Sequence, residues 1–418
     1  MHRRRPVLSP LRNYSIVTAG YWAFTLTDGA LRMLVLLHFH ALGYSPVQLA
    51  FLFLFYEFFG IVTNLFGGYL AARLGLKVTL TLGLAIQVGA LAALALVRAG
   101  WSVPASVAFV MAAQALSGIA KDLTKMSAKS FIKVLIPDDS RGALFKWVAI
   151  LTGSKNALKG VGFFLGGLLL GLLGFKGALA AMAMALAVVF VAVQLSLPGE
   201  LGRTKANAKF REMFSKSRAV NLLSAARFFL FGARDVWFVV GVPVYLYDSL
   251  GWTFAQVGAY LAAWVIGYGA VQSAAPLVIR GLGRGARGGA APSGRSLPPL
   301  AFLLAAATAA IALGLREGLP PALVVTLGLG LFGVLFALNS AIHSYLILAF
   351  SDADQVSMDV GFYYMSNAGG RLAGTLLSGL LFQLAGVPGC LWGAVLFCAI
   401  AGFLSLGLPR QQAVARPL

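Results

Sequence analysis

The segment PGELGRTKANAKFREMFSKSR, Pro198–Arg218, sets the organisation of this chain, because it is the longest polar stretch in an otherwise apolar sequence. The chain has 418 residues, of which 59% are hydrophobic and 11% are charged, and its mean hydropathy is +0.85. A soluble domain averages about 45–50% apolar and about 25% charged residues. The composition therefore indicates an integral membrane protein.

On each side of this segment lie six apolar stretches long enough to cross a bilayer, for which a helix needs about 20 residues. We predict an all-α integral membrane protein with two six-helix halves, residues 1–198 and 218–418, joined by a cytoplasmic linker at 199–217. The twelve predicted helices cover approximately residues 13–40, 46–71, 78–98, 104–128, 142–172, 177–198, 219–247, 253–279, 299–316, 320–349, 356–385 and 387–409.

The net charge of +20 has an explanation in membrane orientation, because cytoplasmic loops carry an excess of Lys and Arg. With the amino terminus inside, 21 of the 33 basic residues fall on the cytoplasmic side and only three fall in outside loops. We therefore expect both termini to be cytoplasmic. Nucleic-acid binding is not indicated.

Nine basic residues remain at membrane depth, against five acids. A Lys or Arg at the centre of a lipid-facing helix costs about 2.5–3.5 kcal/mol on insertion scales. Five carboxylates cannot neutralise nine cations, so a water-filled cavity for a multiply anionic ligand would explain the excess. The cations are Arg32, Lys121, Lys125, Lys146, Lys155, Lys159, Arg227, Arg234 and Arg371, and the acids are Asp28, Glu57, Asp122, Asp235 and Asp359.

Lysines at four-residue spacing share one face of a helix. In the fifth predicted helix, Lys155 lies on the order of 20 Å from the inner end at 1.5 Å per residue. Lys159 and Asn156 lie near it, and we expect this deep pair of lysines to contact the anion. A structural ion pair with a helix of the same half is the alternative, whereas snorkelling explains the shallower Lys146.

The fourth predicted helix carries a second row of lysines, Lys121 and Lys125. Asp122 adjoins Lys121 in sequence, so we expect that it does not neutralise the row. Lys129 and Lys133 continue the row and are expected to be solvated charges on a cytoplasmic extension of the helix.

The seventh predicted helix offers Arg227 and Arg234, a heptad apart on one face, with Asp235 next in sequence. A guanidinium presents a planar fork of donors that can grip phosphate or carboxylate oxygens bidentately. One arginine from each half, Arg32 with Arg227 or Arg234, is expected to meet near a central cavity.

The acids have two kinds of expected role, in proton coupling or in holding the cations when the site is empty. Asp28 and Arg32 are four residues apart, so a salt bridge within one helix is an alternative to ligand binding. A structural pairing of Arg234 with Asp28 or Glu57 across the halves is a further alternative.

Polar residues of the tenth and eleventh predicted helices complete the candidate binding set. Each alone is more often a satisfied hydrogen bond between helices than a ligand contact. These residues are Asn339, His343, Asn367 and Arg371.

The two halves are weakly similar in sequence at an offset of 208 residues. This offset corresponds to six helices, an even number, so equivalent helices cross the membrane in the same direction. The shift superposes Leu42-Gly43 on Leu250-Gly251, Ser45 on Thr253, Gln48 on Gln256 and Asn64 on Gln272. Parallel repeats of this kind are typical of major facilitator transporters.

The segment GYLAARLGLK, residues 68–77, resembles the loop G-x-L-a-D-R-x-G-R-K between the second and third helices of that superfamily. Ala72 replaces the acid and Leu76 replaces a basic residue, so a latch that depends on that carboxylate is in doubt.

Four longer runs resemble the ArsJ family of organoarsenical efflux permeases, and the resemblance extends over nearly the whole chain. The runs are YWAFTLTDGALRM within 13–46, AAQALSGIAKDLTKMSAKS at 112–130, LTGSKNALKGVGFFLGG at 151–167 and FLFGARDVWFVV within 210–245.

The resemblance implies export of 1-arseno-3-phosphoglycerate, which forms when a glyceraldehyde-3-phosphate dehydrogenase uses arsenate in place of phosphate. The acyl arsenate decomposes outside and releases arsenate, so a functional pairing with that dehydrogenase is expected. An organophosphate:phosphate antiporter is the alternative, since it would need the same charges.

Other classes of protein are not indicated. No nucleophile–His–acid set, glycine-rich phosphate loop or metal cluster is evident in the sequence, so we expect neither an enzyme nor a bound cofactor. Cys390 and Cys398 are too few for a disulfide framework. We expect a monomer in the lipid bilayer.

Overall fold

The computed structural model describes residues 10–74, 76–98, 100–135, 141–198, 217–282, 292–350 and 356–409. All regular elements in these ranges are helical. They are α1 (Pro10–Ala41), α2 (Pro46–Leu52), α3 (Leu54–Leu74), α4 (Leu76–Leu94), α5 (Val103–Leu135), α6 (Arg141–Ser196), α7 (Arg218–Phe238), α8 (Gly241–Asp248), α9 (Phe254–Leu282), the 3₁₀ turn η3 (Gly294–Ser296), α10 (Leu297–Arg316), α11 (Pro321–Phe350) and α12 (Val356–Leu406).

Two of these helices each contain two membrane passes. α6 breaks at Gly174, whose φ of 65° favours glycine, and α12 breaks at Ala385 and Gly386. The described residues contain nine stretches that are long and apolar enough to span a bilayer, and two of these are the broken helices. When each broken helix is counted as two passes and the 32-residue α1 is added, the described residues provide twelve passes. This arrangement agrees with the all-α membrane fold predicted from the sequence.

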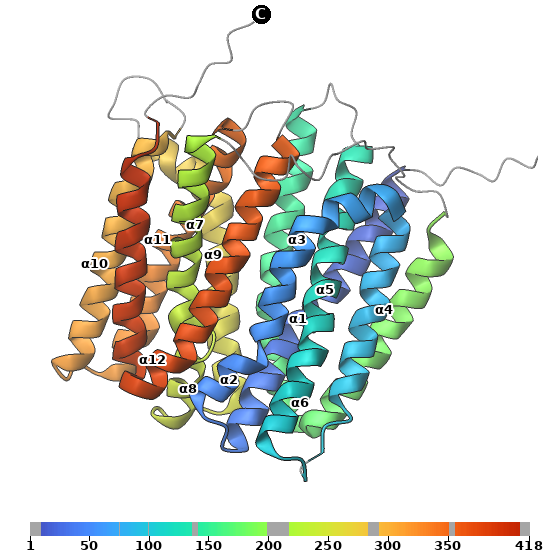
Figure 1. The fold of residues 1–418 in the computed structure, drawn as a ribbon, viewed down its shortest axis with the longest axis horizontal. Helices are drawn as coiled ribbons and strands as arrows, with labels where there is room; N and C mark the ends of the chain where they lie inside the picture. The colour runs from blue at the N-terminus through green and yellow to red at the C-terminus, as the bar shows by residue number, and fades with distance from the viewer. Residues whose placement is uncertain are drawn as a thin grey trace, which may run out of the picture.

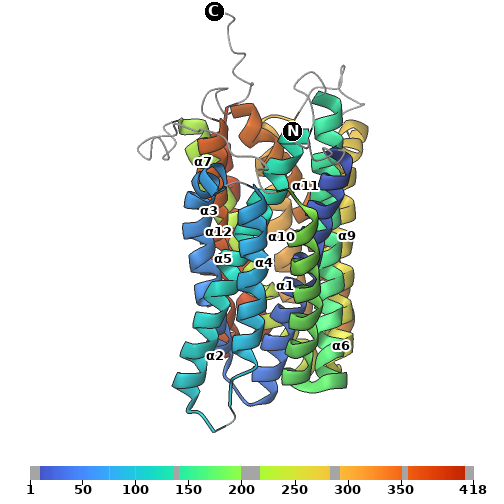
Figure 2. The same cartoon turned by 90° about the vertical axis from the view of Figure 1, so that its right-hand side faces the viewer.

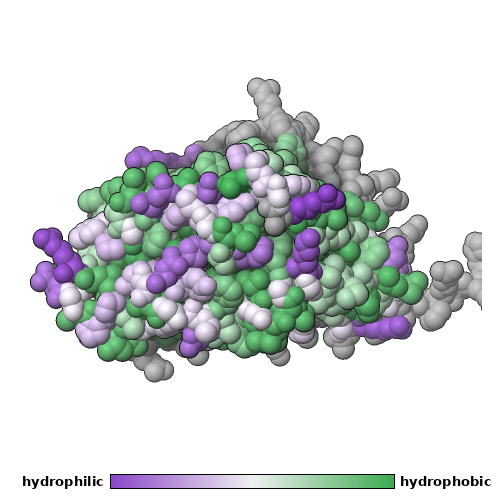
Figure 3. Space-filling view, turned by 90° about the horizontal axis from the view of Figure 1, so that it is seen from below, coloured by the Kyte–Doolittle hydropathy of each residue, from purple (hydrophilic) through white to green (hydrophobic). Residues whose placement is uncertain are grey.

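The helices run side by side in two groups, with α1, α3, α4, α5 and α6 in one and α7, α9, α10, α11 and α12 in the other (Figure 1). The start of α1 and the end of α12 lie at one end of the molecule, here called the terminal face (Figures 1 and 2). The opposite end, which carries the short helices α2 and α8, is the α2–α8 face. Seen end-on, the α2–α8 face exposes hydrophilic residues among hydrophobic ones (Figure 3).

The internal repeat predicted at an offset of 208 residues has a structural counterpart. Gly43 and Gly251 both have positive φ angles, of 85° and 67°. Directly after them, the Ser45 hydroxyl accepts from the backbone N–H of Gln48, and Thr253 does the same for Gln256. The same backbone turn and helix cap therefore recur in each half.

Glycines that bring α6 close to α1 recur 208 residues later, where α12 meets α7. A Cβ atom on Gly162 would lie 2.5 Å from the carbonyl oxygen of Leu26 in α1. Gly370, which is Gly162 plus 208, packs in the same way against the carbonyl oxygen of Phe228 in α7. Small residues allow membrane helices to approach this closely, so α1–α6 and α7–α12 are equivalent pairs.

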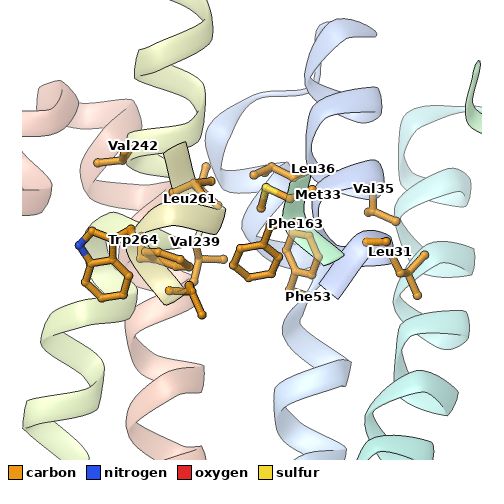
Figure 4. Close-up of a cluster of buried hydrophobic side chains, with 14 of the residues drawn as sticks. Leu31, Met33, Val35, Leu36, Phe53, Phe163, Val239, Val242, Leu261 and Trp264 are labelled. Atoms are coloured by element: carbon orange, nitrogen blue, oxygen red, sulfur yellow. The ribbon is translucent and has the colours of Figure 1, made fainter. Parts of the chain in front are cut away.

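A buried apolar cluster joins the halves beside the α2–α8 face. Figure 4 shows Met33 and Phe53 of one half near Phe163, with Val239 and Trp264 of the other. The rings of Phe163 and Phe238 are 5.9 Å apart between centroids. The polar site described next lies among α1, α3, α6, α7 and α12.

Residues 199–216, which make up all but the last residue of the predicted linker, lie outside the described ranges, so the division into halves at 198 and 218 stays a prediction.

Candidate functional site

Five charged side chains form a chain of ion pairs across the two halves, here called the central charge cluster. Arg32 Nη2 of α1 lies 3.2 Å from Glu57 Oε1 of α3. The same oxygen accepts from Arg371 Nη2 of α12 at 2.6 Å. Arg371 Nε donates to Asp235 Oδ2 of α7 at 3.0 Å, and Arg234 Nε donates to Asp235 Oδ1 at 2.6 Å. Glu57 and Arg371 thus connect the two halves.

The central charge cluster holds three guanidinium groups and two carboxylates, so its formal charge is +1. Glu57 and Asp235 are almost completely buried, while Arg234 and Arg371 keep about a sixth of their side chains exposed, 16% and 14%. Glu57 Oε2 has no hydrogen-bond partner among the described residues. An excess buried cation is costly unless a counter-charge compensates it.

Asp28 does not pair with Arg32, so the salt bridge within one helix that the sequence left open is wrong. Asp28 Oδ1 instead accepts a 2.7 Å hydrogen bond from the hydroxyl of Tyr56 in α3. The side chain of Arg32 points to α3 as well, since its guanidinium lies over the rings of Phe53 and Tyr56. The i,i+4 spacing allowed the contact within the helix, but a neighbouring helix offered a carboxylate and a phenol.

Lys159 lies next to this cluster. Its side chain is close enough to Asp28, Arg32, Glu57 and Arg371 for electrostatic interaction. Its Nζ lies 5.7 Å from the centroid of the Phe163 ring, and its backbone packs against Gly29 of α1. The structure therefore brings a fourth cation from the middle of α6 to the place where α1, α3 and α12 meet.

Lys155 and Asn156 lie one turn closer to the terminal face. Asn156 Nδ2 donates to Gln272 Oε1 of α9 at 3.3 Å, which is a second polar contact between the halves. Lys155 is partly buried. The side chains of Lys129, Lys133 and Lys146 lie outside the described residues, so their expected solvation or snorkelling stays a prediction.

The second row of lysines is more nearly neutralised than the sequence suggested. Lys125 Nζ lies 2.6 Å from Asp122 Oδ1 and 2.6 Å from Asn64 Oδ1. Lys121 Nζ is 3.8 Å from Asp122 Oδ2 and 4.2 Å from the centroid of the Tyr56 ring. The expectation that Asp122 leaves the row unpaired is therefore wrong, because an i,i+3 pair such as Asp122–Lys125 shares a helix face.

Arg227 is separate from the central charge cluster. It donates to Asn367 Oδ1 at 2.9 Å and to Ser340 Oγ at 3.1 Å, so α7, α11 and α12 meet there. Asn339 and His343 are buried on the same stretch of α11. Of the two arginines of α7, Arg234 rather than Arg227 belongs to the central charge cluster, because it shares Asp235 with Arg371. It pairs with Asp235, and the described contacts give it no pairing with Asp28 or Glu57.

Some polar contacts of the site were not predicted. Tyr56 is uncharged and was not among the candidates, and Gln272 was expected on a helix at the interface between the halves but not as a partner of Asn156. His40 of α1 lies 2.8 Å from Asp248 of α8, and these positions are 208 residues apart, so the repeat offset was the signal that could have found this pair. The described residues contain no group of three His, Cys, Asp or Glu side chains able to hold a metal ion.

Residues 17–347 match the Major Facilitator Superfamily. The chain belongs to this superfamily. Among solved structures, it is similar to the crystal structure of a D-xylose–proton symporter, with a TM-score of 0.66 and 15% sequence identity, over 96% of this chain and 98% of that one. No curated protein matches in a sequence search.

As a member of the major facilitator superfamily, the chain is a multi-pass membrane transporter for a small solute and not an enzyme. At 15% identity, the likeness to the symporter shows the shared fold only. The superfamily prediction made from the repeat and the 68–77 loop is thus confirmed, whereas the ArsJ resemblance stays a prediction.

Proposed function

We propose that this transporter exports an organoarsenical phosphate ester, 1-arseno-3-phosphoglycerate, and so confers arsenate resistance in a bacterial inner membrane. The observation that carries the proposal is the positive central charge cluster between the halves, with Lys159 beside it. The sequence runs that resemble ArsJ permeases include Arg32, Lys159 and Arg234 of this site, while Glu57 and Arg371 lie outside the four runs.

The proposed mechanism is an exchange of partners at Arg371. In the described conformation, Glu57 and Asp235 satisfy the guanidinium of Arg371 from the two halves. A phosphate or arsenate group offers the same oxygen acceptors and can replace Glu57, because Arg binds such oxyanions bidentately. Once the contact between Glu57 and Arg371 is replaced, the halves are free to rock. The two acids hold the cations until the next substrate arrives.

The candidate residues differ in how directly they contact the anion in this proposal. Arg32, Lys159, Arg234 and Arg371 contact the anion directly, and Asn156 and Lys155 lie on its path toward the terminal face. The expected division into halves at 198 and 218, the cytoplasmic termini, the monomeric state and the functional pairing with a glyceraldehyde-3-phosphate dehydrogenase are parts of the same proposal.

The proposal is tested by arsenate tolerance in cells that also express the matching dehydrogenase. Lys159→Ala, Lys155→Ala and Arg371→Gln should lose tolerance at normal expression. Arg316→Gln, at an exposed position at the end of α10, is the matched control and should retain it. Full tolerance in the first three variants would show that the cluster is not the binding site.

An organophosphate:phosphate antiporter is the second candidate, since the same cluster would suit its substrate. Uptake of the stable ester 3-phosphoglycerate into vesicles separates the two functions. An antiporter should accumulate the ester in exchange for phosphate, whereas an exporter of acyl arsenates should show little uptake.

A further inference from the structure

The surroundings of Arg227 differ from those of every arginine in the central charge cluster. Arg227 is only 5% exposed. Its hydrogen-bond acceptors, Asn367 Oδ1 and the hydroxyl and carbonyl oxygens of Ser340, are all neutral. Its guanidinium carbon also lies 3.7 Å from the centroid of the Phe231 ring. None of the ion pairs among the described residues includes Arg227. No carboxylate of the described residues therefore forms an ion pair with its buried guanidinium.

Unpaired polar atoms lie on the helix face that meets Arg227. Asn339 is fully buried and His343 is 1% exposed. Among the described residues, neither amide atom of Asn339 nor Nδ1 of His343 has a hydrogen-bond partner. Asn339 and His343 lie at i,i+4, and Ser340 precedes His343 by three residues, so the three share one face of α11. His343 is close enough to Arg227 for electrostatic interaction.

These groups have the chemistry of an oxyanion site. Buried polar atoms in proteins are nearly always paired. The unpaired groups here are the Asn339 amide, which can donate through Nδ2, and Nδ1 of His343, which donates in the tautomer that carries its proton there. We propose that Arg227, Asn339 and His343 form a second anion subsite, which binds one charged end of a substrate whose other charged end is bound by the central charge cluster. This inference rests on the proposed function, because it assumes that the cluster binds an anion.

The separation of the two sites suits a short molecule. Arg227 and Arg234 both lie over Phe231, with their guanidinium carbons 3.7 Å and 5.1 Å from its centroid. The two carbons are therefore at most about 9 Å apart, the sum of these distances. One three-carbon molecule with an oxyanion at each end can therefore reach both arginines.

The subsite is tested by calorimetry on the purified full-length protein with two stable probes. 1,3-Propanediol bisphosphate carries two tetrahedral oxyanions on three carbons, and propyl phosphate carries one. The wild type should bind the bisphosphate at least tenfold more tightly than the monophosphate. Arg227→Gln should reduce this ratio to about one, while its affinity for propyl phosphate stays within about twofold of the wild-type value.

Asn367→Asp is the matched variant, because it keeps the shape of the side chain and places a carboxylate on Arg227 Nε, where the amide oxygen now lies at 2.9 Å. This internal anion should remove the preference for the bisphosphate even if Arg227→Gln fails to fold. An unchanged ratio in Asn367→Asp, or an equal loss for both probes, would overturn the subsite while leaving the proposed function intact. Failure of the wild type to bind either probe would overturn the proposed function itself.

Discussion

Glu57→Gln tests the direction in which substrate affinity changes. The exchange of partners at Arg371 implies that removal of this buried acid tightens substrate binding. Glu57 Oε1 lies 3.2 Å from Arg32 Nη2 and 2.6 Å from Arg371 Nη2, and the residue is fully buried. In the empty transporter, this carboxylate competes with the substrate for both guanidinium groups. Glutamine keeps the size of the side chain and an oxygen acceptor but removes the charge.

The size of the effect follows from the contacts that are lost and kept. Loss of one partner from a buried ion pair costs about 3–5 kcal/mol. The amide oxygen retains hydrogen bonds to a charged donor, which contribute about 1.5–3 kcal/mol. The two arginines of the empty variant therefore lack roughly 2 kcal/mol of stabilisation, which a bound anion restores. Since 1.4 kcal/mol is a tenfold change in Kd, this corresponds to about thirtyfold tighter binding.

The assay is calorimetric titration of Glu57→Gln with 1,3-propanediol bisphosphate. Tighter binding should be accompanied by slower transport, since the substrate then has no carboxylate to replace it on release. Glu317→Gln, an identical change at an exposed position after α10, should leave Kd unchanged. An equal or weaker affinity in Glu57→Gln would refute the exchange of partners.

Three further perturbations test the contacts that hold the site. Gly162→Ala should lower the thermal stability of the detergent-solubilised protein, because its Cβ would lie 2.5 Å from the Leu26 carbonyl oxygen. Gly171→Ala is the control, since its Cβ would meet no atom within 4 Å, and equal melting temperatures of the two variants would contradict the close contact at Gly162. Lys125→Met should destabilise the protein by about 3–5 kcal/mol, because it removes the nearest partner of a fully buried Asp122; unchanged thermal unfolding would disprove the pairing. Asp248→Asn should change the transport rate less than about fivefold. Asp248 is 51% exposed, and a surface ion pair such as the one with His40 contributes at most about 1 kcal/mol of stabilisation. Complete loss of transport would show that this contact is essential.

The membrane passes could be predicted from the sequence because they depend on local composition. The predicted stretch 13–40 became Pro10–Ala41, and 253–279 became Phe254–Leu282. The break within α12 at Ala385 and Gly386 falls at the predicted gap between 385 and 387, and the break within α6 at Gly174 falls inside the predicted gap between 172 and 177. The repeat was also readable, as the turns at Gly43 and Gly251 show.

The partners of the charges could not be predicted in the same way. Glu57 and Arg371 are 314 residues apart, and their contact depends on which helices are neighbours and on how each helix is rotated about its axis. Hydrophobic periodicity specifies neither in a helix that is apolar all round. The Asp122–Lys125 pair, in contrast, was accessible from i,i+3 spacing alone.

The most direct measurement uses inside-out membrane vesicles that contain the transporter, with glyceraldehyde 3-phosphate, NAD⁺, the dehydrogenase and radioactive arsenate in the external medium. If the chain exports 1-arseno-3-phosphoglycerate through the central charge cluster, label accumulates only when the dehydrogenase and the wild-type transporter are both present, and Arg371→Gln abolishes the accumulation. Equal accumulation without the dehydrogenase, or an undiminished rate in Arg371→Gln, would contradict that claim.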